Sequence, residues 1–134
     1  MLGAYPNEVK LVFKNFPLTR IHKFAMGAAV AALAANEQGK FWEYHDKLFE
    51  NYKSLSHKKF QEIAQELGLD MKRFNTDLSN PKLRQAVSKD MDDAVKNGIR
   101  STPTILVNNR SLRSNYRNFS GMKKVIEKEL KRLK

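Results

Sequence analysis

The tetrapeptide Ser101-Thr102-Pro103-Thr104 constrains the fold of this chain more than any other stretch. It runs directly into Ile105-Leu106-Val107, an apolar run that predicts a strand, and then into Asn108-Asn109, which predicts a turn. A proline cannot donate to a sheet ladder, so it belongs at the first position of a strand or in a special turn. A trans proline at the strand start and a cis proline both satisfy this rule, because the cis form of an X-Pro bond costs only about 0.5–1 kcal/mol.

The composition is that of one globular domain. The chain has 134 residues, of which 41% are hydrophobic and 29% charged. Its longest apolar run, residues 24–35, falls short of the roughly 20 residues that a membrane span needs. Residues 1–6 show no basic start and no apolar core, so we expect no secretion signal. As written, the chain would stay in the cytoplasm, and its sequence contains no other targeting signal. Cysteine is absent, which excludes disulfides, thiolate metal sites and cysteine nucleophiles from these residues.

The positive charge is concentrated at the C-terminus. The formal net charge is +11, and residues 110–134 hold nine Lys and Arg against two Glu. The segment interleaves cations with aromatic rings, as a nucleic-acid surface can: Arg110, Arg113, Tyr116, Arg117 and Phe119. The lysines from Lys123 to Lys134 alternate with an apolar stripe, as they would on the solvated face of a terminal helix. We therefore expect no specific nucleic-acid binding, only salt-dependent attraction to polyanions.

A run of helices is predicted between two β segments. Residues 9–16 are rich in β-branched and aromatic side chains and predict a strand that Pro17 stops. Residues 21–38 and 40–52 predict helices, the first ending at Gly39. Ser56, Asp70 and Asn80 each fit a helix N-cap, which places further helices after them, and Gly68 and Gly98 fit helix ends. These helices should pack together as a helical subdomain covering about residues 21–98.

The last part of the chain predicts a hairpin and one more helix. Residues 104–107 and 111–113 form its strands around the Asn108-Asn109 turn, and residues 114–120 form a polar loop. The apolar stripe Met122, Val125, Ile126, Leu130, Leu133 predicts the final helix.

Several blocks together resemble the DsbA-like thioredoxin-fold family of thiol-disulfide oxidoreductases, which includes protein disulfide isomerase-like proteins. They cover nearly the whole chain: residues 9–18, His22, the alanine pairs 28–29 and 31–32, Glu37 to Phe49, Leu67 to Asp70, Ser101 to Thr104, and Leu106 to Asn108. The block from Gly39 to Phe49 and the Thr-Pro-Thr are the most specific. The resemblance implies one α/β thioredoxin-like domain over residues 1–134, with the helical subdomain inserted in it.

The resemblance also implies a role for Thr102 and Pro103. In that family the Thr-Pro peptide bond is cis and faces the active-site disulfide, so we expect a cis bond, buried near the end of the helix that starts at Pro81. Only Thr102 and Pro103 carry over as substrate-binding residues, beside an extended peptide or protein substrate. No cofactor is implied. Family members usually work in the periplasm or cell envelope.

This chain departs from the family at its start. Members begin with a strand and a Cys-X-X-Cys at the head of the first helix, and neither precedes Val9 here. We therefore expect no catalytic residue and no thiol exchange, and we interpret the chain as an N-terminally truncated form lacking a central strand. A second copy of the chain could cover the gap left by that strand, so we expect a homodimer.

The histidines and an aspartate cluster match no known pattern of a metal site. His22, His45 and His57 match no metal-ligand spacing, and His45 should be a packed helix residue. Asp90, Asp92 and Asp93 predict a surface acidic cluster without the pattern of a calcium loop. Two alternatives stay open: a non-catalytic binding module that uses the proline groove or the basic segment, and a relative of the kappa-type glutathione transferases.

Overall fold

The computed structural model describes all of residues 1–134. The chain divides into two compact units, which we name by their content. The helical unit comprises Lys14–Gly98, and the terminal unit combines Met1–Phe13 with Ile99–Lys134. Both ends of the chain therefore belong to the same unit.

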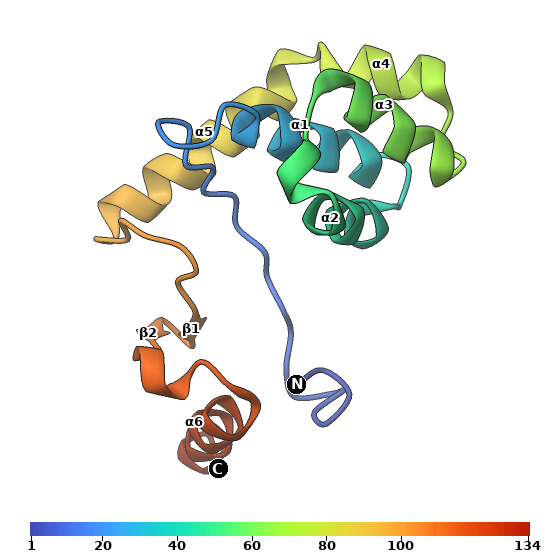
Figure 1. Cartoon of the computed structure of the whole chain (residues 1–134). Coiled ribbons are helices and arrows are strands. Elements are labelled where there is room, and N and C mark those ends of the chain that lie inside the picture. Colours follow the sequence, from blue (N-terminus) through green and yellow to red (C-terminus); the bar gives the residue numbers. More distant parts are fainter. The chain divides into compact units, whose positions relative to one another are not determined.

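Helix α1 and the four helices packed around it make up the helical unit (Figure 1). They are α1 (Ala25–Asn36), α2 (Phe41–Glu50), α3 (His57–Glu66), α4 (Met71–Leu78) and α5 (Pro81–Lys96), with a short 3-10 turn η1 (Tyr52–Ser54) after α2. The alanines of α1 are small enough for α2, α3, α4 and α5 all to pack against it. The largest fully buried side chains are Tyr44, Phe60, Phe74, Ile63 and Val87, so the core of this unit is aromatic and aliphatic around an alanine-rich helix.

Helices α3, α4 and α5 start at the predicted caps. Ser56 accepts a hydrogen bond from the backbone N–H of Lys59, and Asp70 accepts one from that of Arg73. Asn80 caps α5, with Pro81 in its first turn. The glycines predicted at helix ends, Gly39, Gly68 and Gly98, all have positive φ between 70° and 74°. The first predicted helix is shorter than expected, because α1 begins at Ala25 and the residues from Ile21 to Phe24 form turns.

The predicted strand at residues 9–16 is wrong. No regular structure is present there, and the backbone groups of Lys10, Leu11 and Val12 make no hydrogen bond. A strand exists only through a ladder with a neighbour, and no other segment of this chain pairs with these residues. The side chains of this segment favour a strand, but a strand also needs a second segment to pair with.

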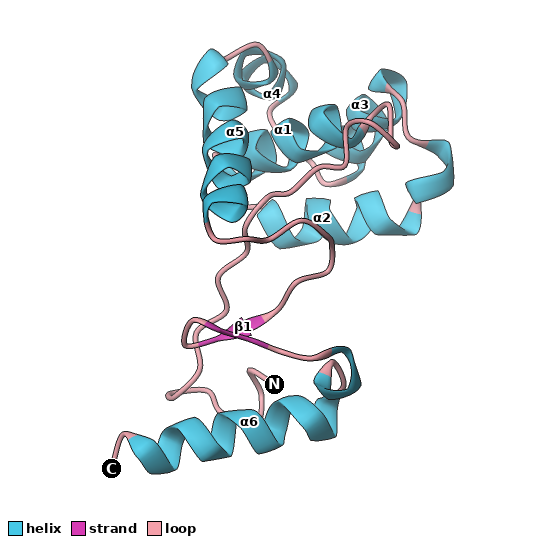
Figure 2. Cartoon of the chain, turned by 90° about the vertical axis from the view of Figure 1, so that its left-hand side faces the viewer, coloured by secondary structure: helices cyan, strands magenta, loops and turns pink.

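The terminal unit contains a small hairpin and α6 (Figure 2). Strand β1 (Leu106–Val107) pairs antiparallel with β2 (Arg110–Ser111), so that Leu106 faces Ser111 and Val107 faces Arg110. Asn108 and Asn109 form the predicted turn with φ of 46° and 65°. The strands are shorter than predicted, although the N–H of Leu112 donates to the carbonyl of Ile105 just beyond them.

The final helix starts earlier than its apolar stripe indicates. A 3-10 turn η2 (Ser114–Tyr116) lies in the predicted loop, and α6 (Phe119–Arg132) follows it. Asn118 caps α6 by accepting a 2.8 Å hydrogen bond from the N–H of Gly121. Helix α6 turns Ile126 inward and its lysines outward. No helix in either unit has both the length and the apolar composition to span a membrane.

Candidate functional site

Thr102 and Pro103 lie in the terminal unit, on the segment that leads into β1. The peptide bond between them is cis. Both residues are exposed, so the expectation of a buried proline is wrong. The hydroxyl of Thr104 donates a 2.6 Å hydrogen bond back to the carbonyl of Ser101, which closes a tight turn around Thr102 and Pro103. The turn holds these two residues at the surface.

The backbone that follows this turn is largely unpaired. From Thr102 to Ile105, only the carbonyl of Ile105 takes part in a main-chain hydrogen bond. Strand β1 has β2 on one side only, because the sheet has two strands, so its other edge is open. The side chain of Leu106 on β1 is 45% exposed. We name residues Thr102–Leu106 the binding segment: it offers backbone donors and acceptors and one exposed apolar side chain to an extended chain.

The hairpin into which the binding segment leads is joined to α6 by a buried carboxylate. Glu129 is 7% exposed and lies 3.0 Å from Arg132 Nη1 and 3.4 Å from Arg110 Nη1. Burial by itself raises the pKa of the Glu129 carboxyl, but the hydrogen bond and the charge of Arg132, with the charge of Arg110, outweigh it and lower the pKa overall. Since Arg110 comes from β2, this carboxylate fixes the open-edged hairpin onto the helix.

The three histidines belong to the helical unit, whereas the binding segment belongs to the terminal unit. The 134 residues contain no cysteine, and no cluster of three or more His, Asp or Glu is arranged to hold a metal ion. His45 packs in a row of rings on α2, 5.3 Å from Trp42 and 4.8 Å from Phe49 between ring centroids. His57 packs edge-on to Phe24, with centroids 5.7 Å apart. These two histidines therefore belong to the packing of the helical unit.

One member of the acidic cluster has a structural partner that the sequence did not indicate. Asp90 Oδ2 accepts hydrogen bonds from the backbone N–H of Asn15 at 2.9 Å and from its side-chain Nδ2 at 3.2 Å. Lys14 Nζ lies 3.4 Å from Asp90 Oδ1. Asp90 thus anchors the start of the helical unit to α5, and the prediction of a purely surface cluster is wrong for this residue. No local signal joins two residues 75 positions apart.

Two neighbours of Thr102 and Pro103 were not singled out from the sequence. Thr104 closes the turn, and Leu106 supplies the exposed apolar side chain. Alternation within the apolar run could have identified Leu106, since a strand in a two-stranded hairpin leaves one face uncovered.

Comparison with known proteins identifies the family. The family model described as Thioredoxin matches residues 3–128, nearly the whole chain. The probable disulfide bond formation protein D of Bacillus cereus is 30% identical over 132 residues, which make up 93% of this chain and 60% of that protein. The Na(+)/H(+) antiporter NhaA 3 of Salinispora tropica is 38% identical over 103 residues, 77% of this chain but 16% of the antiporter. The antiporter NhaA of Herminiimonas arsenicoxydans is 35% identical over 112 residues, 84% of this chain and 18% of that protein.

The chain belongs to the thioredoxin family, and within it to the DsbA-like thioredoxin-fold proteins. The expected α/β thioredoxin-like class is confirmed by the family match. The chain spans about three fifths of the Bacillus relative and about a sixth of the antiporters. It therefore corresponds to one part of each of these longer proteins.

Proposed function

We propose that this chain is the peptide-holding part of a DsbA-like thiol-disulfide oxidoreductase. In this proposal residues 1–134 form a single thioredoxin-like domain, with a helical subdomain at about residues 21–98. The binding segment carries the function: Thr102 and Pro103 present the surface on which an extended substrate chain lies. The 134 residues supply no thiol, so the disulfide chemistry of the family has to come from groups outside them.

The single observation that supports this proposal is the unpaired backbone from Thr102 to the open edge of β1. An extended peptide can add to such an edge through main-chain hydrogen bonds, which are independent of the substrate's sequence. That independence suits a protein whose substrates are unfolded chains of many sequences. Leu106 adds an apolar contact, which unfolded chains offer in abundance.

Two measurements test the proposal. With reduced, alkylated insulin B chain as the peptide, amide NMR shifts should change at Thr102, Thr104 and Leu106 first. Thr102→Arg should abolish these changes by blocking the surface, whereas Thr19→Arg, at an exposed residue of the helical unit, should not. Shift changes confined to the helical unit would contradict the assignment.

The second measurement separates binding from chemistry. Dithiothreitol-driven reduction of insulin should proceed at the rate of the protein-free blank, because thiol exchange needs a cysteine thiolate and this chain has none. A rate well above the blank from a pure preparation would show chemistry that the proposal does not contain.

A further inference from the structure

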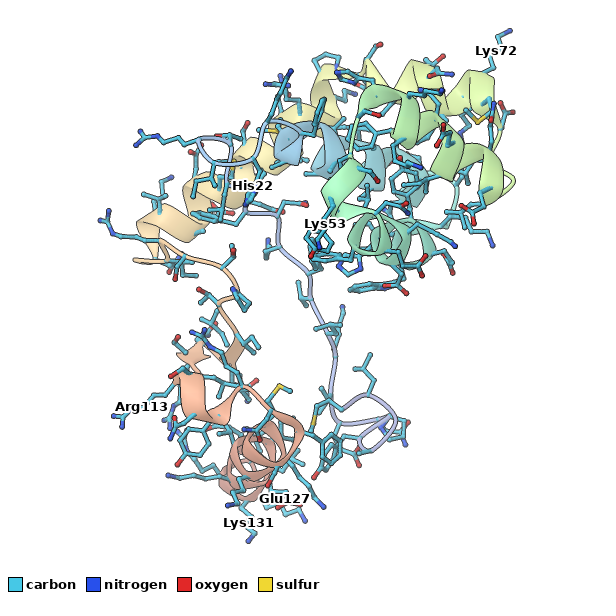
Figure 3. The ribbon with its side chains drawn as sticks, viewed as in Figure 1. His22, Lys53, Lys72, Arg113, Glu127 and Lys131 are labelled. Atoms are coloured by element: carbon cyan, nitrogen blue, oxygen red, sulfur yellow. The ribbon has the colours of Figure 1, made fainter.

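The terminal unit carries most of the protein's net positive charge. It holds eleven Lys and Arg against three Glu, for a formal net charge of +8, whereas the larger helical unit holds fourteen against eleven acidic residues, for +3. Figure 3 shows Arg113 and Lys131 extending away from the ribbon of the terminal unit. The excess of cations is therefore a property of one folded unit.

Internal ion pairs use few of these cations. Glu129 is paired with Arg132 and Arg110, as described above. Glu127 accepts a 3.0 Å hydrogen bond from the hydroxyl of Tyr5 and lies 3.9 Å from Lys123. The exposed cations left without an acidic partner in α6 and the segment before it are Arg113, Arg117, Lys124, Lys128 and Lys131. We name these five residues the basic face.

Three lysines of the basic face form a row along α6. At 3.6 residues per turn, Lys124, Lys128 and Lys131 fall within a sector of about 60° around the helix axis. They spread over about 10 Å of its length, at 1.5 Å per residue. Each of the three lysines can contact one phosphate of a flexible strand, so the row can contact about three phosphates. Exposed lysines in such a row can neutralise them together.

The two arginines are held close to the start of this row. A Cβ on Gly121 would lie 2.6 Å from the Cα of Tyr116, so η2 packs directly against the first turn of α6 and any side chain at position 121 would clash with it. This contact fixes Arg113, Tyr116 and Arg117 relative to the helix. The ring of Tyr116 is 38% exposed. An exposed aromatic ring among cations is the arrangement on which an unpaired base stacks.

We propose that the basic face binds single-stranded nucleic acid without sequence preference. The lysine row of α6 neutralises the phosphates, and Tyr116 stacks on one base. This surface is distinct from the binding segment and its function does not depend on peptide binding there.

An anionic membrane is the weaker partner for this surface. An amphipathic helix binds a bilayer by inserting its apolar face, but the apolar stripe of α6 from Met122 to Leu130 is buried or half-buried, with Ile126 only 7% exposed. A bilayer would then meet the charges of the basic face and only the exposed end residues Phe119 and Leu133, and Tyr116 with its flanking arginines would have no specific role.

The test uses the full chain and a fluorescent oligothymidylate, with anisotropy measured between about 50 and 200 mM salt. Binding should weaken steeply as salt rises. The triple variant K124Q/K128Q/K131Q should lower the slope of log affinity against log salt by about 2, since each phosphate contact on a single strand contributes about 0.7. Tyr116→Leu should weaken binding at least about fivefold, the lower limit for one stacked base, with the slope unchanged.

A matched control distinguishes the basic face from net charge. The variant K58Q/K72Q/K82Q removes three exposed lysines from the helical unit and changes the net charge equally. It should keep the wild-type slope. Equal losses in both triple variants, an unchanged Tyr116→Leu affinity, or binding to vesicles of phosphatidylserine and phosphatidylcholine but not to the oligonucleotide would each overturn the proposal.

Discussion

The hydroxyl of Tyr44 donates a 2.9 Å hydrogen bond to the backbone carbonyl of Phe60 inside the core of the helical unit. Both residues are almost fully buried, Tyr44 at 0% and Phe60 at 2% exposure. This bond links α2 to α3 across the core. Burial also raises the pKa of the Tyr44 phenol, so the hydroxyl stays a donor over the whole physiological pH range.

Tyr44→Phe should therefore destabilise the helical unit. The ring keeps its packing, whereas the carbonyl of Phe60 loses its side-chain donor, for an expected cost of about 0.5–1.5 kcal/mol. Urea unfolding followed by the fluorescence of Trp42, the only tryptophan, measures it. Tyr52→Phe is the control, since Tyr52 is 64% exposed and should change the free energy of unfolding by much less. Equal effects of the two substitutions would refute a structural role for the bond.

The contact between Gly121 and Tyr116 leads to a second prediction, for the terminal unit. Gly121→Ala would place a methyl group 2.6 to 2.9 Å from three backbone atoms of Tyr116, which cannot rotate away as a side chain can. We expect a cost of about 1–3 kcal/mol, typical of overpacking. Faster hydrogen exchange at the amides of η2 and early α6 would report it. Gly3→Ala, where a Cβ would meet nothing within 4 Å, should leave exchange unchanged; protection as in the wild type for Gly121→Ala would contradict the prediction.

Local signals in the sequence predicted the helical unit well. The caps Ser56, Asp70 and Asn80 depend on a side chain and a backbone N–H two or three residues away, so the sequence alone contains both partners. The turn at Asn108 and Asn109 depends on the φ that those two residues tolerate. Such features need no knowledge of the remaining fold.

Features that need a distant partner were missed or misjudged. The strand at residues 9–16 was predicted from its own side chains, but the ladder it needs is absent. The hydrogen bonds of Asn15 to Asp90 join residues 75 positions apart. For the binding segment, the sequence identified Thr102 and Pro103 through a family pattern, while their exposure depends on what packs over them. Burial is decided by tertiary packing, which no tetrapeptide encodes.

A third prediction concerns acid stability through Glu129. Because Arg132 and Arg110 lower the pKa of the Glu129 carboxyl below the ordinary glutamate value of 4.5, the folded state binds the proton less readily than the unfolded state. The resulting stabilisation is fully present above the unfolded pKa and is lost as the pH falls through the folded pKa. Exchange protection at the amide of Ile126 should therefore fall on acidification below about pH 4.5.

Glu129→Gln tests this assignment. The variant should be less protected at neutral pH, because Arg110 and Arg132 lose their common carboxylate, and it should respond less to acid. Glu8→Gln, which removes an exposed carboxylate from the same unit, should keep the wild-type response. An acid response of Glu129→Gln as steep as that of the wild type would assign the loss to other carboxylates.

The last prediction is that two copies of the chain associate through residues 9–13. The backbone groups of Lys10, Leu11 and Val12 are unpaired, and Leu11 and Val12 are 55% and 63% exposed. A segment with strand-forming side chains and free backbone groups can pair with an identical segment about a two-fold axis, which satisfies the facing edge of each copy. Light scattering coupled to gel filtration should then show a species of twice 15.5 kDa whose fraction grows with protein concentration.

Val12→Lys should restore the monomer by placing a charge on each of the paired edges, whereas Ile21→Lys, at a residue 73% exposed in the helical unit, should leave the dimer intact. A well-folded 15.5 kDa species at every concentration would count against the dimer.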